Sequence, residues 1–302
     1  DIEYTNRRRT TKREAFLEKM DTTLPWNAWV SLVVPHYPDG KRGRKPVEIE
    51  QMLRMTMLQT WFNLSDEGIE DAIYDSYAMK TFMGIDFSAG EQVPDATTLC
   101  KFRKLLNDHG LQKKFFDQVQ ELLAQEGKLV SGGTIVDATF VEAPRQHNHR
   151  DENEDIKKGN VPEAWKRPEN IHKLRQKDTD ARWTRKGNHS YYGYKDHVKA
   201  DADSKLITDY KVTHAAVHDS QPMPEMINKS DKAVYADSAY WGKVVAEALR
   251  ENVENHIHER GTKQHPLTEE QKASNKIKSK TRCRIEHIFV FMTGAMHGIT
   301  VR

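Results

Sequence analysis

Apolar residues in the first third of the chain recur at the three- and four-residue spacing of amphipathic helices. After Pro46 they stand at Ile49, Met52 and Leu53, and similar faces follow within residues 65–77, 95–110 and 111–127. Ser65 and Asp95 are placed to cap the N-termini of two of these helices. Gly110 and Gly127 are placed to end two of them. Residues 1–128 are therefore predicted to form an all-helical N-terminal domain.

The period changes after Gly132-Gly133 from that of helices to that of strands. Residues 134–141 are rich in β-branched side chains, and residues 191–200 and 205–213 alternate between apolar and polar. The remaining predictions here are a hairpin turn at 201–204, a short helix after Pro222 and Pro224, a short strand at 232–236 and a helix at 242–252. This order predicts an α/β domain with a mixed sheet over residues 129–302.

Residues 145–186 break this pattern. The segment is polar, interrupted by prolines and without an apolar period. It is predicted to be a long loop or a poorly ordered insertion within the α/β domain.

Length and composition narrow the class of protein. A chain of 302 residues exceeds the usual length for one core, and no apolar stretch approaches the ~18–20 residues that span a membrane. The only two cysteines, Cys100 and Cys283, exclude a disulfide framework or a cysteine-rich zinc site and favour a reducing cytoplasm. We interpret the start at Asp1 as trimmed, and the stop at Arg302 as an end that could also be trimmed.

The formal net charge of +2 hides three basic runs. Arg7 to Arg13 holds five basic residues, Lys41 to Lys45 holds four, and Arg260 to Arg284 holds eight against two glutamates. Each run alone can equally be a solvated surface. Because the third run leads directly into Glu286, a polyanionic substrate is the better interpretation there.

Three acids stand where an acid is costly. Asp137 lies inside an apolar strand, Asp237 closes another, and Glu286 lies on the basic helix. Together they would form an all-oxygen site of the kind that Mg²⁺ accepts, suited to two-metal phosphoryl transfer. The alternatives are a solvated edge-strand acid for Asp137, a helix cap before Tyr240 for Asp237, and an exposed surface acid for Glu286.

The order and spacing of five motifs resemble those of the DDE transposases of bacterial insertion sequences, and most nearly the insertion-sequence-five branch. The motifs are Asp137-Ala138-Thr139, residues 187–197, His218-Asp219-Ser220, residues 236–242 and Arg282 to Glu286. Residues 43–46, 64–66 and 94–98 are similar to the N-terminal domain of that branch. The resemblance implies a ribonuclease-H-like catalytic core.

The resemblance also implies that Asp137, Asp237 and Glu286 are the catalytic and metal-binding triad, and the interval between the last two is too short for a large inserted β-domain. In the family signature around the glutamate, Arg282 is present, whereas Ser279 and Thr293 replace a tyrosine and a lysine. Arg282 lies one helical turn before Glu286, so it can meet a phosphate beside the metals or pair with Glu286.

Other candidates remain open. Lys195 and His197 alternate with Tyr194 and Asp196 on one strand, and the sequence does not decide which pair faces the active site. The pair His218-Asp219 is interpreted as a loop or capping element rather than a metal site. Trp165, Trp183 and Trp241 are candidates for stacking on unpaired bases or for core packing.

These observations predict a DNA transposase that uses two Mg²⁺ or Mn²⁺ ions, frees the 3′ ends of its element at terminal inverted repeats and joins them to target DNA. Residues 1–128 would bind DNA or dimerise, and paired ends favour a homodimer. The predicted contacts to double-stranded DNA are Arg44, Lys45, Lys195, His197, Lys276, Lys278, Lys280, Arg282 and Arg284. The alternatives are a structure-specific nuclease of the same fold and a non-catalytic DNA-binding relic.

Overall fold

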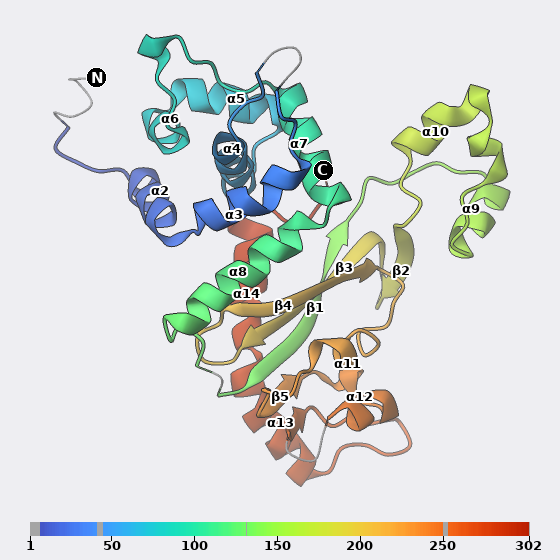
Figure 1. Cartoon of the computed structure of the whole chain (residues 1–302). Coiled ribbons are helices and arrows are strands. Elements are labelled where there is room, and N and C mark those ends of the chain that lie inside the picture. Colours follow the sequence, from blue (N-terminus) through green and yellow to red (C-terminus); the bar gives the residue numbers. More distant parts are fainter. Residues whose placement is uncertain (1–6, 41–44, 131, 250–252, 302) are drawn as a thin grey trace. The chain divides into compact units, whose positions relative to one another are not determined.

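The computed structural model describes residues 7–40, 45–130, 132–249 and 253–301 (Figure 1). The chain divides into two compact units, Asp1–Glu126 and Gly127–Arg302. None of the helices in the described residues is long and apolar enough to cross a membrane.

The first unit consists of helices. They are α2 (Lys12–Thr23), α3 (Trp26–Val33), α4 (Ile49–Phe62), α5 (Asp66–Asp75), α6 (Tyr77–Met83), α7 (Ala96–Asp108) and α8 (Leu111–Gln125), with 3₁₀ turns η1 (Val34–His36) and η2 (Phe87–Ala89). The predicted caps are confirmed, because Ser65 accepts a hydrogen bond from the Gly68 N–H and Asp95 from the Thr98 N–H. Gly110 and Gly127 have positive φ, which suits the ends of α7 and α8.

The core of this unit surrounds α4, whose Met52, Leu53, Met55 and Leu58 are fully buried. These four residues continue the helical spacing that the sequence shows after Pro46. The unit therefore has an apolar core of its own, independent of the second unit.

The second unit is built on one mixed sheet. Its strands are β1 (Thr134–Glu142), β2 (Arg182–Lys186), β3 (His189–Asp201), β4 (Ile207–His214), β5 (Ala233–Ala236) and β6 (Glu254–Ile257), ordered β2-β3-β1-β5-β6 with β4 also paired to β3. β3 is antiparallel to β1, β2 and β4, whereas β5 is parallel to both β1 and β6. The predicted fold class, a ribonuclease-H-like core after a helical region, is confirmed; β6 was not predicted.

The helices of this unit are α9 (Arg150–Lys157), α10 (Ile171–Gln176), α11 (Met223–Met226), α12 (Lys243–Ala248), α13 (Glu269–Arg282) and α14 (Arg284–Val290). Short turns η3 (Glu163–Lys166), η4 (Pro168–Asn170) and η5 (Ser238–Tyr240) and the π-helical segment η6 (Phe291–Ala295) complete it. The helix predicted at 242–252 ends earlier, and residues 250–252 of that prediction lie outside the described residues.

The two faces of the sheet carry separate apolar clusters. Ile135, Val198 and Tyr235 pack with Ile285 of α14 on one face. On the other face, a second cluster joins β1 and β5 to α11, η5 and α12. Because side chains alternate along a strand, this division assigns every residue of β1, β3 and β5 to one face or the other.

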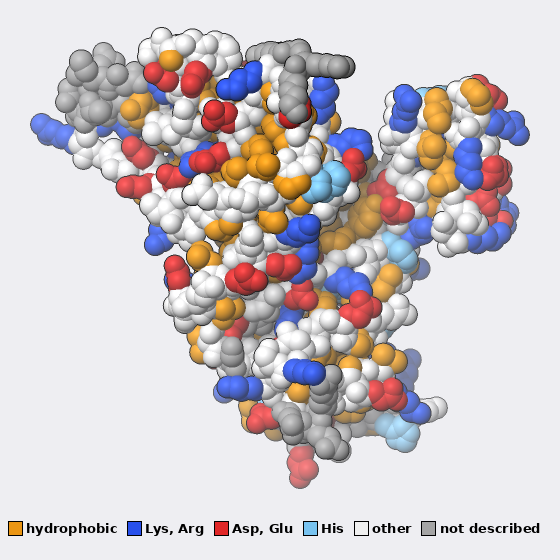
Figure 2. Space-filling model, viewed as in Figure 1, with side chains coloured by type: hydrophobic (Ala, Val, Ile, Leu, Met, Phe, Trp, Pro, Cys, Tyr) orange, Lys and Arg blue, Asp and Glu red, His pale blue; other side chains and the backbone are white. Residues whose placement is uncertain are grey.

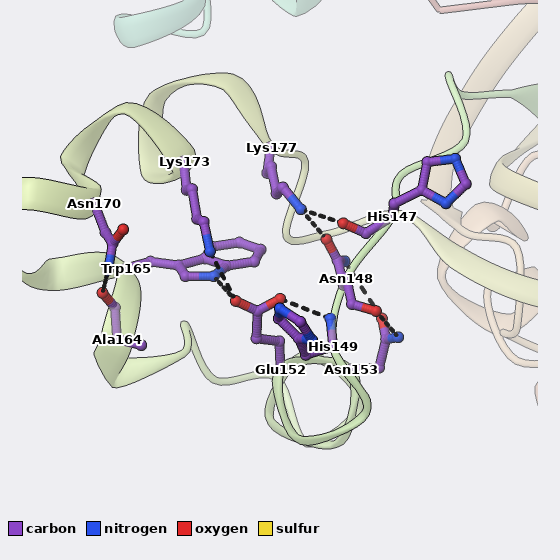
Figure 3. A network of polar contacts seen from close by, with 10 residues as sticks. All are labelled: His147, Asn148, His149, Glu152, Asn153, Ala164, Trp165, Asn170, Lys173 and Lys177. Carbon is purple, nitrogen blue, oxygen red and sulfur yellow. Dashed lines mark hydrogen bonds and ion pairs between the residues drawn. The ribbon is translucent and has the colours of Figure 1, made fainter.

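The prediction of a long loop at 145–186 is wrong. The segment forms α9, η3, η4, α10 and β2, and Trp165 at its centre is fully buried. The indole Nε1 of Trp165 donates to Glu152 Oε1 at 2.6 Å, Lys173 Nζ lies 3.3 Å from the same oxygen, and Glu152 Oε2 accepts the His149 N–H (Figure 3). The prediction failed because one tryptophan and a buried carboxylate organise the segment, and neither produces an apolar period.

Candidate active site

The sheet brings Asp137 and Asp237 side by side. β1 and β5 pair in parallel with Thr134 opposite Val234 and Ile135 opposite Tyr235. Continuing that register by two residues sets Asp237, which directly follows β5, beside Asp137. Both aspartates have the parity of Ile135 and Tyr235, so they belong to the face that α14 covers.

Asp137 is held between its own backbone and an arginine. Its Oδ1 accepts the Ala138 N–H at 2.8 Å, and its Oδ2 accepts from Arg282 Nη1 at 2.9 Å. Burial raises the pKa of Asp137 to about 6, against the opposing effects of the Ala138 N–H and Arg282 and with added repulsion from Asp237. Burial of the Asp137 carboxyl therefore outweighs the stabilisation that Arg282 gives its charged form.

Arg282 joins Asp137 to Glu286. It is the last residue of α13, and after Cys283 the chain continues as α14, where Glu286 accepts a hydrogen bond from Nη2 of the same guanidinium at 3.2 Å. The predicted i,i+4 ion pair is confirmed, and a contact of Arg282 with phosphate stays a prediction. The Glu286 side chain is 60% exposed, against 18% for Asp137, so it forms the outer edge of the site.

Asp237 caps the turn that follows it. Its Oδ1 accepts a hydrogen bond from the Ala239 N–H at 2.7 Å, at the start of η5. The alternative interpretation of Asp237 as a cap is therefore confirmed for this oxygen atom. At the end of the same turn, Tyr240 is buried, and burial together with Asp137, Asp219 and Asp237 holds its pKa well above the usual value. Its hydroxyl therefore stays protonated.

One further residue of this region was missed as a functional candidate, and the sequence left the orientation of another open. The missed residue is Tyr240, whose spacing of three from Asp237 could have signalled it. The other is Asp196 on β3, which pairs with Thr139 and so faces the same side as Asp137; burial raises its pKa to about 6. The alternation of residues 191–200 could have found Asp196 only with the register in hand.

The acids fit a hard cation by their chemistry, but their arrangement is not that of a closed site. Carboxylate oxygens are the ligands Mg²⁺ prefers, and the buried Asp137 carboxyl would be stabilised in its charged form by a nearby cation. Over the residues that the structure describes, however, no group of three or more His, Cys, Asp or Glu side chains is close enough to hold a metal ion. Arg282 stands between Asp137 and Glu286, so its guanidinium must move before both can share an ion.

Lys195 and His197 lie on the face of the sheet opposite Asp137. Lys195 Nζ donates to the Val217 carbonyl at 2.7 Å and to Asp219 at 2.8 Å, and His197 Nε2 lies 2.9 Å from the Thr213 hydroxyl. Both are buried, and burial lowers the pKa of His197 to about 4. These contacts place both side chains in the interior of the unit rather than on a surface that DNA can reach.

The loop interpretation of His218-Asp219 agrees with the contacts. Asp219 is the partner of Lys195, and His218 Nδ1 lies 2.8 Å from the Ser220 hydroxyl within the same turn.

The other predicted DNA contacts differ in their surroundings. Lys276 and Lys280 are exposed on α13, and Lys45 is exposed in the first unit. Lys278 donates to the Ile257 carbonyl at 3.1 Å, and Arg284 donates to the Ala202 carbonyl at 2.7 Å and pairs with an aspartate of the β3–β4 turn. Arg44 lies outside the described residues.

The mixed sheet with two adjacent aspartates defines a ribonuclease-H-like α/β domain. Residues 129–302 match the family model described as Transposase DDE domain, and residues 5–105 match Transposase domain (DUF772). The first of these matches covers more than half of the chain, and the chain belongs to the DDE transposase family. No solved structure matches this chain.

Proposed function

We propose that the protein is a DNA transposase of the insertion-sequence-five branch, which cleaves at the terminal inverted repeats of its element and joins the freed 3′-hydroxyls to target DNA. The observation that carries the proposal is the adjacency of Asp137 and Asp237 on the face of the sheet that α14 covers. Glu286 belongs to the same group, because Arg282 donates hydrogen bonds to both Asp137 and Glu286.

Asp137, Asp237 and Glu286 are the residues that would hold two Mg²⁺ or Mn²⁺ ions. Such ions lower the pKa of a nucleophilic water or hydroxyl and stabilise the leaving 3′-oxygen. The contribution of the protein itself is position, because Asp137 lies on β1 and Asp237 directly follows β5, so the sheet positions two of the three carboxylates.

Arg282 supplies the phosphate contact in this proposal. Its two terminal nitrogens already bond two carboxylate oxygens, and a phosphate accepts a guanidinium fork in the same manner. A phosphate that replaces Asp137 and Glu286 as its partner would release both carboxylates for metal ions. Substrate binding and completion of the acidic site would then be one event.

The target DNA would run along α13. Lys276 and Lys280 are exposed on this helix, directly before the residues of the site, whereas Lys278 is tied to β6 and the Glu259 side chain. The first unit would bind DNA or pair two copies of the chain, so that both ends of an element are processed together. A homodimer on paired ends is the simplest such assembly.

The test is strand transfer by a pre-cleaved end. A duplex carrying the terminal repeat, with its 3′-hydroxyl already exposed, is incubated with plasmid and Mg²⁺, and covalently joined product is expected. The double variant Lys276→Ala/Lys280→Ala should lower joining more than it lowers hydrolysis of an uncut end. Lys272→Ala, on the same helix but paired with Glu269, is the matched control.

Two outcomes would contradict this proposal. If uncut ends are cleaved but pre-cleaved ends give only nicked plasmid, the protein is a structure-specific nuclease. If neither reaction occurs while repeat DNA is still bound, it is a non-catalytic DNA-binding protein.

A further inference from the structure

A cavity of about 730 Å³ opens between the inserted segment and the sheet of the second unit. The end of α9 contributes Lys157 and Lys158, and the strands contribute Arg182, Trp183, Tyr192 and His214. None of the three proposed catalytic acids lines it. The volume is that of an ordinary small-molecule site, large enough for one nucleotide.

The lining has the chemistry of a nucleotide site. Its described residues include three cations, Lys157, Lys158 and Arg182, and no carboxylate. Acidic and basic side chains are otherwise interspersed over the α9–α10 region, at the upper right of Figure 2. Asp178 and Asp180 stand close enough to act on Tyr192 and His214, but the side chains that line the cavity itself carry positive charge, which favours an anion there.

Trp183 supplies a flat aromatic surface beside those cations. It is 51% exposed, it lies 5.1 Å from Tyr192 at an interplanar angle of 40°, and the Arg145 guanidinium stands 5.6 Å from its ring centroid. The exposed half of the Trp183 ring is apolar surface that a ligand could cover. An aromatic face next to guanidinium and ammonium groups is the arrangement on which unpaired bases stack.

His214 adds a polar group that is not yet satisfied. Its Nδ1 is buried, and the described part of the chain offers it no hydrogen-bond partner. Burial and the nearby Arg182 lower the pKa of His214, so the ring is neutral and can either donate or accept. The His214 ring lines the cavity and adds an aromatic, polar side chain to it.

The cavity lies on the same face of the sheet as Asp137. Asp137 is opposite Val198, and Tyr192 stands further along β3 with the same parity, opposite which β2 places Trp183. At about 3.4 Å per residue, the positions of Val198 and Tyr192 are roughly 20 Å apart along the strand. The cavity and the acids therefore belong to the same side of the sheet.

We propose that this cavity binds an unpaired nucleotide of a DNA strand, stacking the base on Trp183 and holding its phosphates with Lys157, Lys158 and Arg182. The inference rests on the proposed function for its ligand, because DNA is what that function brings to this face of the sheet. In this proposal, the insertion binds single-stranded DNA about 20 Å from the acids.

Binding of a short labelled single-stranded oligonucleotide and of the matching duplex, followed by anisotropy in EDTA, tests the proposal. Trp183→Ala should weaken single-strand binding about 5- to 150-fold, the range expected when one base no longer stacks, and leave duplex binding within about twofold. Trp183→Phe keeps an aromatic face and should lose much less affinity. Thermal unfolding verifies that each variant is folded.

The lysines give an independent arm should Trp183→Ala fail to fold. Lys157→Ala/Lys158→Ala should weaken single-strand binding and lower its log–log salt slope by about 0.7 for each phosphate that is no longer bound. Lys166→Ala, a lysine of the same insertion paired with Glu163 and absent from the cavity lining, is the matched control and should bind normally.

Three results would overturn the proposal. They are equal losses of affinity for single strand and duplex, no loss in either set of variants, and displacement of the oligonucleotide by a free mononucleotide at comparable concentration. Because EDTA removes catalysis from the assay, failure of strand transfer leaves a positive binding result intact. Conversely, if Trp183→Ala binds single strands normally and the protein still performs strand transfer, the nucleotide site in this cavity is disproved and the proposed function stands.

Discussion

Arg282 is the central residue of the candidate site, because it pairs with two acids that the proposed chemistry requires as metal ligands. The guanidinium bonds Asp137 and Glu286 at once, yet burial still raises the pKa of Asp137 to about 6. A divalent ion beside the buried Asp137 carboxyl would therefore favour its charged form.

The three acids should be separable from DNA binding. Asp137→Asn, Asp237→Asn and Glu286→Gln should each abolish cleavage and leave DNA affinity within a fewfold, because the amide keeps the shape but loses the charge that holds a metal. In thermal unfolding, Mn²⁺ should stabilise the wild type and fail to stabilise the Asp137 variant. Cleavage at the wild-type rate by any one variant would remove that residue from the triad.

Removal of the guanidinium should have opposite effects on two measurements. Arg282→Gln should bind Mn²⁺ roughly tenfold more tightly by calorimetry, because a cation no longer competes for Asp137 and Glu286, while cleavage of DNA falls. Arg284→Gln is the control, since Arg284 bonds the β3–β4 turn instead. Weaker Mn²⁺ binding in Arg282→Gln would mean that Arg282 positions the carboxylates rather than competing with the metal.

Among the elements, those with a regular pattern were predicted and those defined by pairing or by single contacts were not. β1, β3, β4 and β5 carry β-branched or alternating residues and stand where the sequence indicates. β6 reads Glu254-Asn-His-Ile257, a polar edge strand whose order comes from pairing with β5. No local pattern could reveal it.

The same limit applies to the site. The sequence indicates which acids are special, and the spacing predicts the pairing of Arg282 with Glu286. It cannot show that Lys195 faces away from Asp137, because that depends on the register between β1 and β3. It also cannot show that Arg282 reaches Asp137, a contact 145 residues apart along the chain.

The insertion offers a prediction about pH. Burial acts to raise the pKa of Glu152, but the hydrogen bonds from Trp165, the His149 N–H and Lys173 together lower it to about 2. A carboxyl whose folded pKa is depressed stabilises the fold above its unfolded pKa near 4.5 and loses that contribution as the pH falls towards about 2. The amount at stake is of order 3 kcal/mol.

Hydrogen exchange at the Trp165 indole measures this loss. Protection should fall between pH 4.5 and 2 in the wild type, and in Glu152→Gln it should be weak throughout and nearly independent of pH. Glu163→Gln changes an exposed carboxylate of the same insertion and should behave like the wild type. A wild-type profile for Glu152→Gln would show that Trp165 packing alone maintains the segment.

At the scale of the whole molecule, the two units divide the charge between them. The runs Arg7 to Arg13 and Lys41 to Lys45 lie in the first unit, and the third run, most of it on α13, lies in the second. Net charge near zero overall, with basic runs in both units, suits a protein that must hold DNA in more than one place.

Neutralising a first-unit run should change how binding depends on salt. The slope of log affinity against log salt should flatten by about 0.9 for each phosphate of duplex DNA that the variant no longer binds. We expect this for alanine at Arg8, Arg9 and Lys12, which are exposed, whereas Arg7 pairs with Glu14 and serves as the control. An unchanged slope would return the run to the status of solvated surface.

The position of the insertion also governs how quickly the protein can fold. β1 and β3 form the longest pairing in the sheet, and residues 143–188 must be looped out before those strands can meet. The entropic cost of closing a loop grows with its length, by about 0.6 kcal/mol per doubling, so an insertion that collapses early around Trp165 shortens the effective loop. Variants that loosen Trp165 should therefore slow the pairing of β1 with β3, and lengthen the time for which these strands are open to aggregation.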